Sequence, residues 1–165
     1  MRSRPTALAA AAVALLVSGC GEAEIDVGKA SKFIDAAVTK QVGAQVKSVK
    51  CPDSVVVKAK DTFRCRVTGT DGTAGDAELT QKDDKGNLTF YAPFLHTKEA
   101  ARVMQTQLRN RSRRTRDATV GCPQIVVVAK NRTFDCVVTI GGRERRLVAR
   151  QTDANGNFTY RVLTT

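Results

Sequence analysis

Four of the five cysteines in this 165-residue chain occur in two copies of one sequence pattern. Between Cys51 and Cys65 lie a proline, a run of three valines and a Thr-Phe pair, and the same pattern returns 71 residues later between Cys122 and Cys136. These thiols could form disulfides or hold zinc. Zinc sites favour short Cys-x-x-Cys spacing or histidine partners, and neither occurs near these cysteines. The repeat therefore predicts two disulfides, Cys51–Cys65 and Cys122–Cys136, one in each copy.

The fifth cysteine, Cys20, follows a segment with the features of a bacterial export signal. Arg2 and Arg4 precede a short apolar run at residues 7–17, which is shorter than the roughly 20 residues of a membrane helix. The sequence Val17-Ser18-Gly19-Cys20 resembles the bacterial lipobox. An ordinary secretory signal that contains an incidental cysteine is the alternative interpretation.

By the lipobox resemblance, residues 1–19 are a lipoprotein signal peptide and Cys20 is the first residue of the mature protein. Its sulfur would carry diacylglycerol and its amine a fatty acyl chain such as palmitate. Two or more acyl chains give a stable membrane anchor. We therefore expect a lipid-anchored protein on the extracytoplasmic face of the bacterial cell membrane, with residues 20–30 as the lipidated cysteine and a tether.

The charge of the chain is distributed unevenly between its two halves. Residues 21–96 contain 11 basic and 11 acidic side chains, whereas residues 97–165 contain 14 basic and 5 acidic ones. The net charge of the mature chain, +9, therefore belongs to the second half alone. Such an excess favours an anionic partner for the second half.

Other residues able to do chemistry are sparse. His96 is the single histidine, and no nucleophile motif lies near it, so we expect it to pack at the junction between the copies or to lie on the surface. Asp83, Asp84 and Asp153 fall in predicted hairpin turns, where carboxylates are normally solvated. No glycine-rich phosphate loop is present. The sequence thus predicts a protein that is not an enzyme and that has no metal or cofactor.

Hydrophobic periodicity predicts the same elements in both copies. Apolar residues at steps of three and four indicate a helix over residues 31–46, and its counterpart is expected to begin at Thr97 as N-cap. Short strands should follow the helix, over residues 55–58, 62–68, 77–81 and 88–91 in the first copy. The predicted fold is α+β: two tandem modules, residues 31–94 and 95–165, each with one amphipathic helix packed on a four-stranded antiparallel meander and one disulfide.

The order of lipobox, amphipathic helix, Cys-Pro, valine run, Thr-Phe-x-Cys strand and glycine-turned hairpin resembles the actinobacterial family catalogued as domain of unknown function 4333. The similarity covers about residues 25–92 and 95–163. It implies small exported or membrane-tethered modules, single or tandem, and it implies no activity. Members often have glycine in the turn where this chain has Lys60 and Asn131. Because lysine adopts a left-handed backbone poorly, we expect the first of these turns to differ in shape.

The predicted binding residues are arginines of the second module, and they are expected to contact an anionic envelope component, either lipid headgroups or wall polymer. They are Arg109, Arg111, Arg113, Arg114, Arg116, Arg143, Arg145, Arg146 and Arg150. A solvated basic face without a partner is one alternative. A module that binds or inhibits an acidic protein is another, because tandem helix-plus-sheet modules resemble in outline the secreted β-lactamase inhibitor proteins. Nucleic acid is not an expected partner outside the membrane, and the chain lacks tryptophan for stacking.

Overall fold

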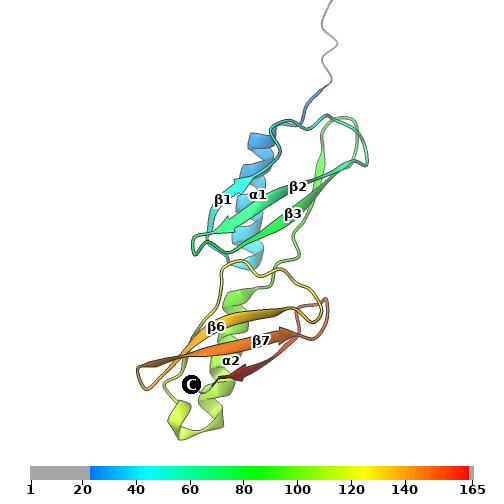
Figure 1. Ribbon diagram of the computed structural model, residues 1–165. Coiled ribbons are helices and arrows are strands. Elements are labelled where there is room, and N and C mark those ends of the chain that lie inside the picture. Colours follow the sequence, from blue (N-terminus) through cyan, green and yellow to red (C-terminus); the bar gives the residue numbers. More distant parts are fainter. Residues whose placement is uncertain (1–22, 164–165) are drawn as a thin grey trace, which may run out of the picture.

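The structure is a computed structural model that describes residues 23–163. The predicted signal peptide, residues 1–19, and Cys20 lie outside the described residues. Two modules follow one another, and in each a helix packs against one side of a four-stranded antiparallel sheet (Figure 1). The predicted fold class is confirmed, as are the disulfides Cys51–Cys65 and Cys122–Cys136. No helix within residues 23–163 is long and apolar enough to span a membrane.

Both sheets have their strands in sequence order, β1-β2-β3-β4 and β5-β6-β7-β8. The elements of the first module are α1 Val27–Val42, β1 Val46–Lys50, β2 Thr62–Gly69, β3 Ala74–Gln81 and β4 Leu88–Tyr91. Those of the second are α2 Thr97–Arg111, the 3-10 helix η1 Arg113–Thr115, β5 Thr119–Gly121, β6 Thr133–Ile140, β7 Arg143–Gln151 and β8 Phe158–Val162.

Helix α1 begins and ends four residues earlier than the sequence analysis predicted. Asp26 is the N-cap, and its side chain accepts a hydrogen bond from Lys29 N at 2.9 Å. Gly43 ends the helix in a left-handed conformation, which glycine adopts without steric penalty. Residues 23–25, which we expected to be tether, instead pair with residues 55–57 through the hydrogen bonds Ile25 N to Val55 O and Val57 N to Ala23 O.

Helix α2 also differs from prediction at its start. Its N-cap is His96, which makes no side-chain capping bond, and Thr97 is a buried first residue rather than the cap. On the apolar side of this helix, Ala100, Met104 and Leu108 are buried in the core of the second module, whereas Ala101 is only partly buried.

The first strand of each sheet lies before the first cysteine, not in the valine run after it. Lys50 at the end of β1 pairs with Arg66 of β2, so that Cys51 follows the ladder and bonds to Cys65 on the neighbouring strand. Pro52 has no N–H to continue this ladder. The predicted strand over residues 55–58 is therefore wrong, and Val56 makes only an isolated bridge to Glu24.

Two buried glutamines hold the valine runs in place. Gln81 Oε1 accepts a hydrogen bond from Lys58 N at 2.8 Å, and Gln81 Nε2 donates to Val56 O at 3.0 Å. Gln151 makes the same pair of bonds in the second module, from Ala129 N at 3.0 Å and to Val127 O at 3.0 Å. A loop that cannot join the sheet thus has its backbone groups satisfied by one side chain.

The turns at Lys60 and Asn131 have the same shape, contrary to the predicted difference. Both residues have left-handed backbones, with φ of 70° and 66°. Lys60 N donates to Gln81 O at 2.7 Å, and Asn131 N donates to Gln151 O at 2.9 Å. These equivalent backbone bonds fix the conformation of the turn even where the residue is lysine.

Candidate anion-binding surface

The basic residues of the two modules differ in kind as well as in number. Residues 97–165 contain 12 arginines and 2 lysines, whereas residues 21–96 contain 2 arginines and 9 lysines. A guanidinium group can donate two parallel hydrogen bonds to a phosphate or carboxylate, which an ammonium group cannot. The second module is therefore the better equipped of the two to bind oxyanions.

Five of these 12 arginines lie where α2 ends, in a segment that side-chain hydrogen bonds hold in place. Thr115 Oγ1 donates to Leu108 O, and Arg109 Nε donates to Ala118 O at 2.7 Å. Ala118 is fully buried in the second core. The loop after α2 is thus fixed to the module, while Arg113 and Arg114 on η1 remain exposed to solvent.

The β6–β7 hairpin adds two more arginines to this region. Asp117 Oδ2 accepts a hydrogen bond from Gly141 N at 2.7 Å, which joins the turn of the hairpin to the loop after η1. Arg143 and Arg145 follow that turn. Because side chains alternate along β7, these two arginines lie on the same side of the strand as buried Leu147, which is the side that faces the helix. Arg145 is half-buried and Arg143 is exposed.

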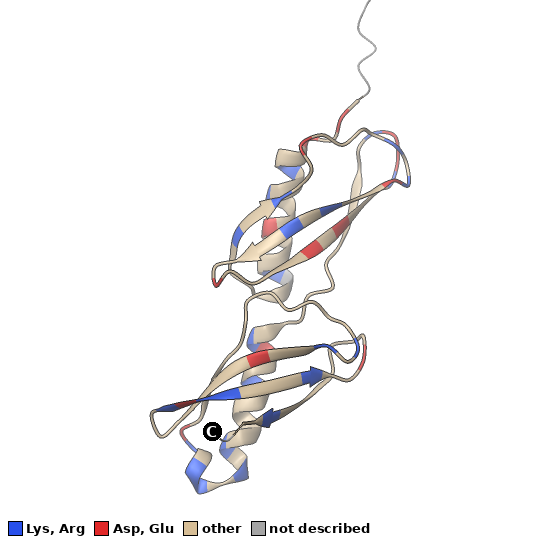
Figure 2. Cartoon of the chain, in the orientation of Figure 1, with Lys and Arg blue, Asp and Glu red and all other residues tan. Residues whose placement is uncertain are grey.

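Together these residues form a basic end of the second module, at the end of the molecule opposite the N-terminal segment (Figure 2). This distal basic end consists of Arg109, Arg111, Arg113, Arg114, Arg116, Arg143 and Arg145.

The two remaining predicted residues, Arg146 and Arg150, lie on the other side of the sheet. Arg146 Nη2 donates to Asp135 Oδ2 at 2.7 Å, and this bond raises the pKa of Arg146. Arg150 Nη2 donates to Asn131 Oδ1 at 3.0 Å. The nine predicted arginines therefore form two groups rather than one face.

Arg161 belongs with Arg150 on this outer sheet face, although it was not among the predicted binding residues. Residue pairing sets Val148 opposite Arg161 and Arg150 opposite Thr159, so the two arginines are diagonal neighbours on adjacent strands. Both line a shallow hollow of about 480 Å³, with Asn131, Thr133, Val148, Thr159 and Tyr160 as the other lining residues. The alternation within residues 158–162 could have placed Arg161 outward, had the pairing of β7 with β8 been known.

The arginines of the two modules also differ in how many of them form ion pairs. Both arginines of the first module are paired across β2 and β3, Arg64 with Glu78 at 3.3 Å and Arg66 with Asp76 at 3.0 Å. Within residues 97–163 the ion pairs are Arg102–Glu99 and Arg146–Asp135. In the described part of the chain, none of the seven arginines of the distal basic end forms an ion pair.

Both modules match one known protein family. A family model described as "Domain of unknown function (DUF4333)" matches residues 10–86 and again residues 88–156. The chain belongs to this family. No curated protein and no solved structure matches the chain.

In both DUF4333 modules the turn carboxylates have a structural role. Asp83 accepts hydrogen bonds from Lys85 N, Asn87 N and the Asn87 amide, and Asp153 makes the equivalent three bonds with Asn155 and Asn157. These bonds, with the side-chain amide first, lower the pKa of both carboxyl groups. They hold the β3–β4 and β7–β8 turns closed.

His96 lies at the junction of the two DUF4333 modules. A Cβ added at Gly43, the C-cap of α1, would come within 3.2 Å of His96 Cε1, so the ring lies against the end of that helix. Among residues 23–163 no group of three or more potential metal ligands comes together.

Proposed function

We propose that this protein is a non-catalytic, lipid-anchored component of the bacterial cell envelope, and that its distal basic end binds an anionic envelope polymer. The observation that carries the proposal is the concentration of seven arginines without a described ion-pair partner at one end of the second module. The ligand chemistry is phosphate or carboxylate, which arginine binds through paired N–H donors. Wall polymers and lipid headgroups both present such groups.

The distance from the anchor favours the polymer over the headgroups. Ala23 is already fixed to the first module, so Cys20 can lie at most about 10 Å from it along the chain. The two helices, of 16 and 15 residues, follow one another along the molecule and together measure roughly 45 Å (Figure 1). Screening at physiological salt acts over about 8 Å. Unless the molecule lies flat, its basic end is beyond the electrostatic reach of the membrane that holds the anchor.

The anchor itself has a direct test. Replacement of Cys20 by serine removes the sulfur that would be acylated, so we expect the protein to move from the membrane fraction to the medium. Detergent phase partitioning of both forms measures this. If the Cys20→Ser protein still partitions into the detergent phase, the lipid anchor is wrong, whatever the second module binds.

Charge reversal tests the binding surface. We expect the variant Arg113→Glu, Arg114→Glu, Arg116→Glu to bind anionic wall polymer at least tenfold more weakly than the parent protein, because three attractions become repulsions. Both proteins carry Cys20→Ser so that they are soluble. Co-sedimentation with purified cell wall, at low and at physiological salt, measures binding, and vesicles containing phosphatidylglycerol form the headgroup arm.

A matched control comes from the first module. Lys32→Glu, Lys40→Glu, Lys47→Glu changes the net charge by the same amount at exposed positions, and we expect it to retain most of the binding. Equal losses in the two triple variants would show a general charge effect, and binding that salt does not weaken would exclude the arginines as its cause. Stronger binding to vesicles than to wall would favour headgroups.

The outer sheet face supports a second candidate function, recognition of an acidic protein. Its hollow combines Arg150 and Arg161 with two threonines, and Val137 on the same face is 47% exposed. Such a mixture of arginine and apolar surface is common at protein interfaces. Loss of capture of an envelope protein by Arg150→Glu, with wall binding unchanged, would support this candidate.

A further inference from the structure

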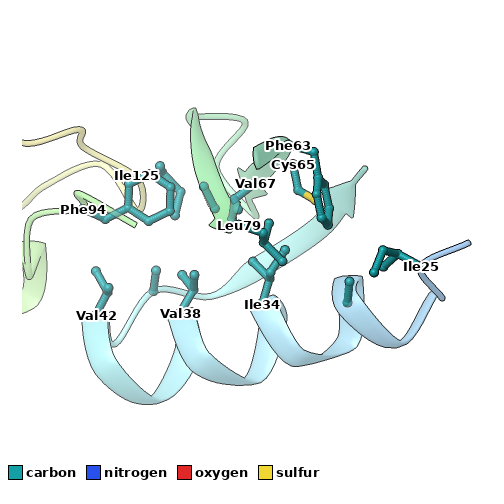
Figure 3. Packing of buried hydrophobic residues seen from close by; sticks show 13 residues of the cluster. Ile25, Ile34, Val38, Val42, Phe63, Cys65, Val67, Leu79, Phe94 and Ile125 are labelled. Carbon is teal, nitrogen blue, oxygen red and sulfur yellow. The ribbon is translucent and has the colours of Figure 1, made fainter. Parts of the chain in front are cut away.

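The sequence analysis placed the end of the first module at residue 94, but Phe94 pairs with Val127, so residues 93–95 are counted here with the second module. The two modules interlock because two side chains of the second module, so defined, lie in the core of the first. Phe94 and Ile125 are 8% and 4% exposed, and both pack in the cluster that contains Val42, Val67 and Leu79 of the first module (Figure 3). The cluster of the second module does not include them. We call Phe94 and Ile125 the apolar plug.

The plug comes from an element that both modules contain. Residues 93–95 pair with residues 126–128 through Leu95 N to Val126 O and Val128 N to Pro93 O, as residues 23–25 pair with residues 55–57 in the first module. At the start of the first module the positions equivalent to Phe94 and Ile125 are Glu24 and Ser54. Ser54 Oγ donates to Glu24 Oε1 at 2.7 Å, and both residues are exposed. The same element is therefore polar and exposed in the first module, but apolar and buried in the second.

Two glycines of the first module make room for the plug. A Cβ at Gly75 would lie 2.7 Å from Phe94 Cε1 and 2.8 Å from Val127 Cγ2. A Cβ at Gly69 would lie 2.7 Å from Gln124 Cβ. Real Cβ atoms do not approach other atoms so closely, so neither position can carry a side chain while the modules stay in contact. Gly69 and Gly75 form the socket.

The hairpin that carries the socket also binds the backbone of the second module. Asp71 Oδ2 accepts a hydrogen bond from Gln124 N at 2.7 Å, and Thr73 Oγ1 accepts one from Ile125 N at 3.0 Å. Burial by itself would raise the pKa of Asp71, but the hydrogen bonds from Thr73 and Gln124 outweigh it and lower that pKa. Gln45 N adds a bond to Gln124 Oε1 at 3.0 Å.

The second module has no such socket at its far end. Strand pairing sets Val67 opposite Gly75 and Val138 opposite Arg145, so Arg145 is the counterpart of Gly75, and Ile140 is that of Gly69. Ile140 packs on the core of its own module, and Arg145 is half-buried. The turn between them is Gly141-Gly142, without counterparts of the Asp71 and Thr73 side chains.

We propose that these positions determine which DUF4333 modules can stack. Glycines at the socket, with Asp and Thr in the turn, accept a following module that presents two large apolar residues. Isoleucine and arginine at the socket positions leave no room for such residues, so no further module can stack there. In this chain the first module depends on the second to close its core, whereas the core of the second contains residues of its own module alone.

The test replaces the two residues of the plug by their equivalents in the first module, which are glutamate at position 24 and serine at position 54. In the full chain with Cys20→Ser, Phe94→Glu and Ile125→Ser should speed amide hydrogen exchange in β2 and β3 at least tenfold and leave β6 and β7 within twofold of the parent protein. The second module keeps its fold because neither residue is in its core. The control variant Glu24→Ala with Ser54→Ala, at the equivalent positions of the first module, should leave amide exchange unchanged in both modules.

A second variant disrupts the interface by a substitution in the socket. Gly75→Ala should reproduce the faster exchange in the first module, and Gly121→Ala is its control, because a Cβ at Gly121 meets no atom within 4 Å. Neither glycine has a positive φ, so backbone strain does not separate them. Unchanged exchange of the first module in either test variant, or equal acceleration of both modules, would overturn the proposal.

Discussion

Replacement of both Cys122 and Cys136 by alanine is expected to lower the free energy of unfolding of the second module by about 3 kcal/mol, the chain-entropy estimate for a loop of 15 residues. Cys136 is 2% exposed and packs in the second core, so the loss of its sulfur adds a packing penalty to the entropic one. Urea denaturation of the oxidised parent and the variant measures the difference.

The equivalent change in the first module, Cys51→Ala with Cys65→Ala, should have the smaller effect. The first core gains Phe94 and Ile125 from its neighbour, and its helix buries Ile34, Val38 and Val42. Helix α2 supplies only Ala100, Met104 and Leu108 to a core that receives no such addition. An equal or larger loss in the first module would contradict this ranking. Removal of both cysteines in each variant avoids a free thiol, which could form unwanted disulfides.

Local patterns predicted the elements whose stability is local. Alternation in Phe63, Cys65 and Val67 and the glycine turns gave the strands β2 to β4 almost as observed, because one face of each strand is buried and the hairpins join neighbours in sequence. The strand β1 was missed because it is short and its place depends on pairing across the disulfide. The valine run was assigned as a strand because it has strand composition, although Pro52 and Gln81 keep it outside the sheet.

The candidate site was predictable in its charge but not in its shape. The arginine excess is visible in the composition, yet its division between the distal basic end and the outer sheet face depends on which side of β7 each residue takes. Arg161 joins Arg150 only through the pairing of β7 with β8. The two copies of the repeat also differ in sequence at the positions that form the interlock, where Gly69 corresponds to Ile140 and Gly75 to Arg145. The meaning of this difference required the contacts of Phe94 and Ile125.

The buried glutamines should be among the most sensitive positions of the chain. Gln151 is 0% exposed and Gln81 is 1% exposed, and no buried side-chain N or O atom in the described part of the chain lacks a partner. Gln151→Met keeps a similar volume but leaves Ala129 N and Val127 O without their bonds. An unsatisfied buried polar group costs about 1–3 kcal/mol, so we expect a loss of about 2–6 kcal/mol for the two. Thermal or urea denaturation measures it, with the exposed Gln107→Met as control.

A glutamate at the same position separates the two hydrogen bonds. Gln151→Glu keeps an acceptor for Ala129 N, but when ionised it faces Val127 O without a proton to donate. Burial and the facing carbonyl should raise the pKa of this carboxyl group in the folded protein above its unfolded value. Its contribution to stability is then present at low pH and is lost as the pH rises through the folded pKa. The variant should therefore approach the parent protein in stability near pH 4 and fall below it at pH 7, whereas a variant with the same deficit at both pH values would mean that the donor bond to Val127 O contributes nothing.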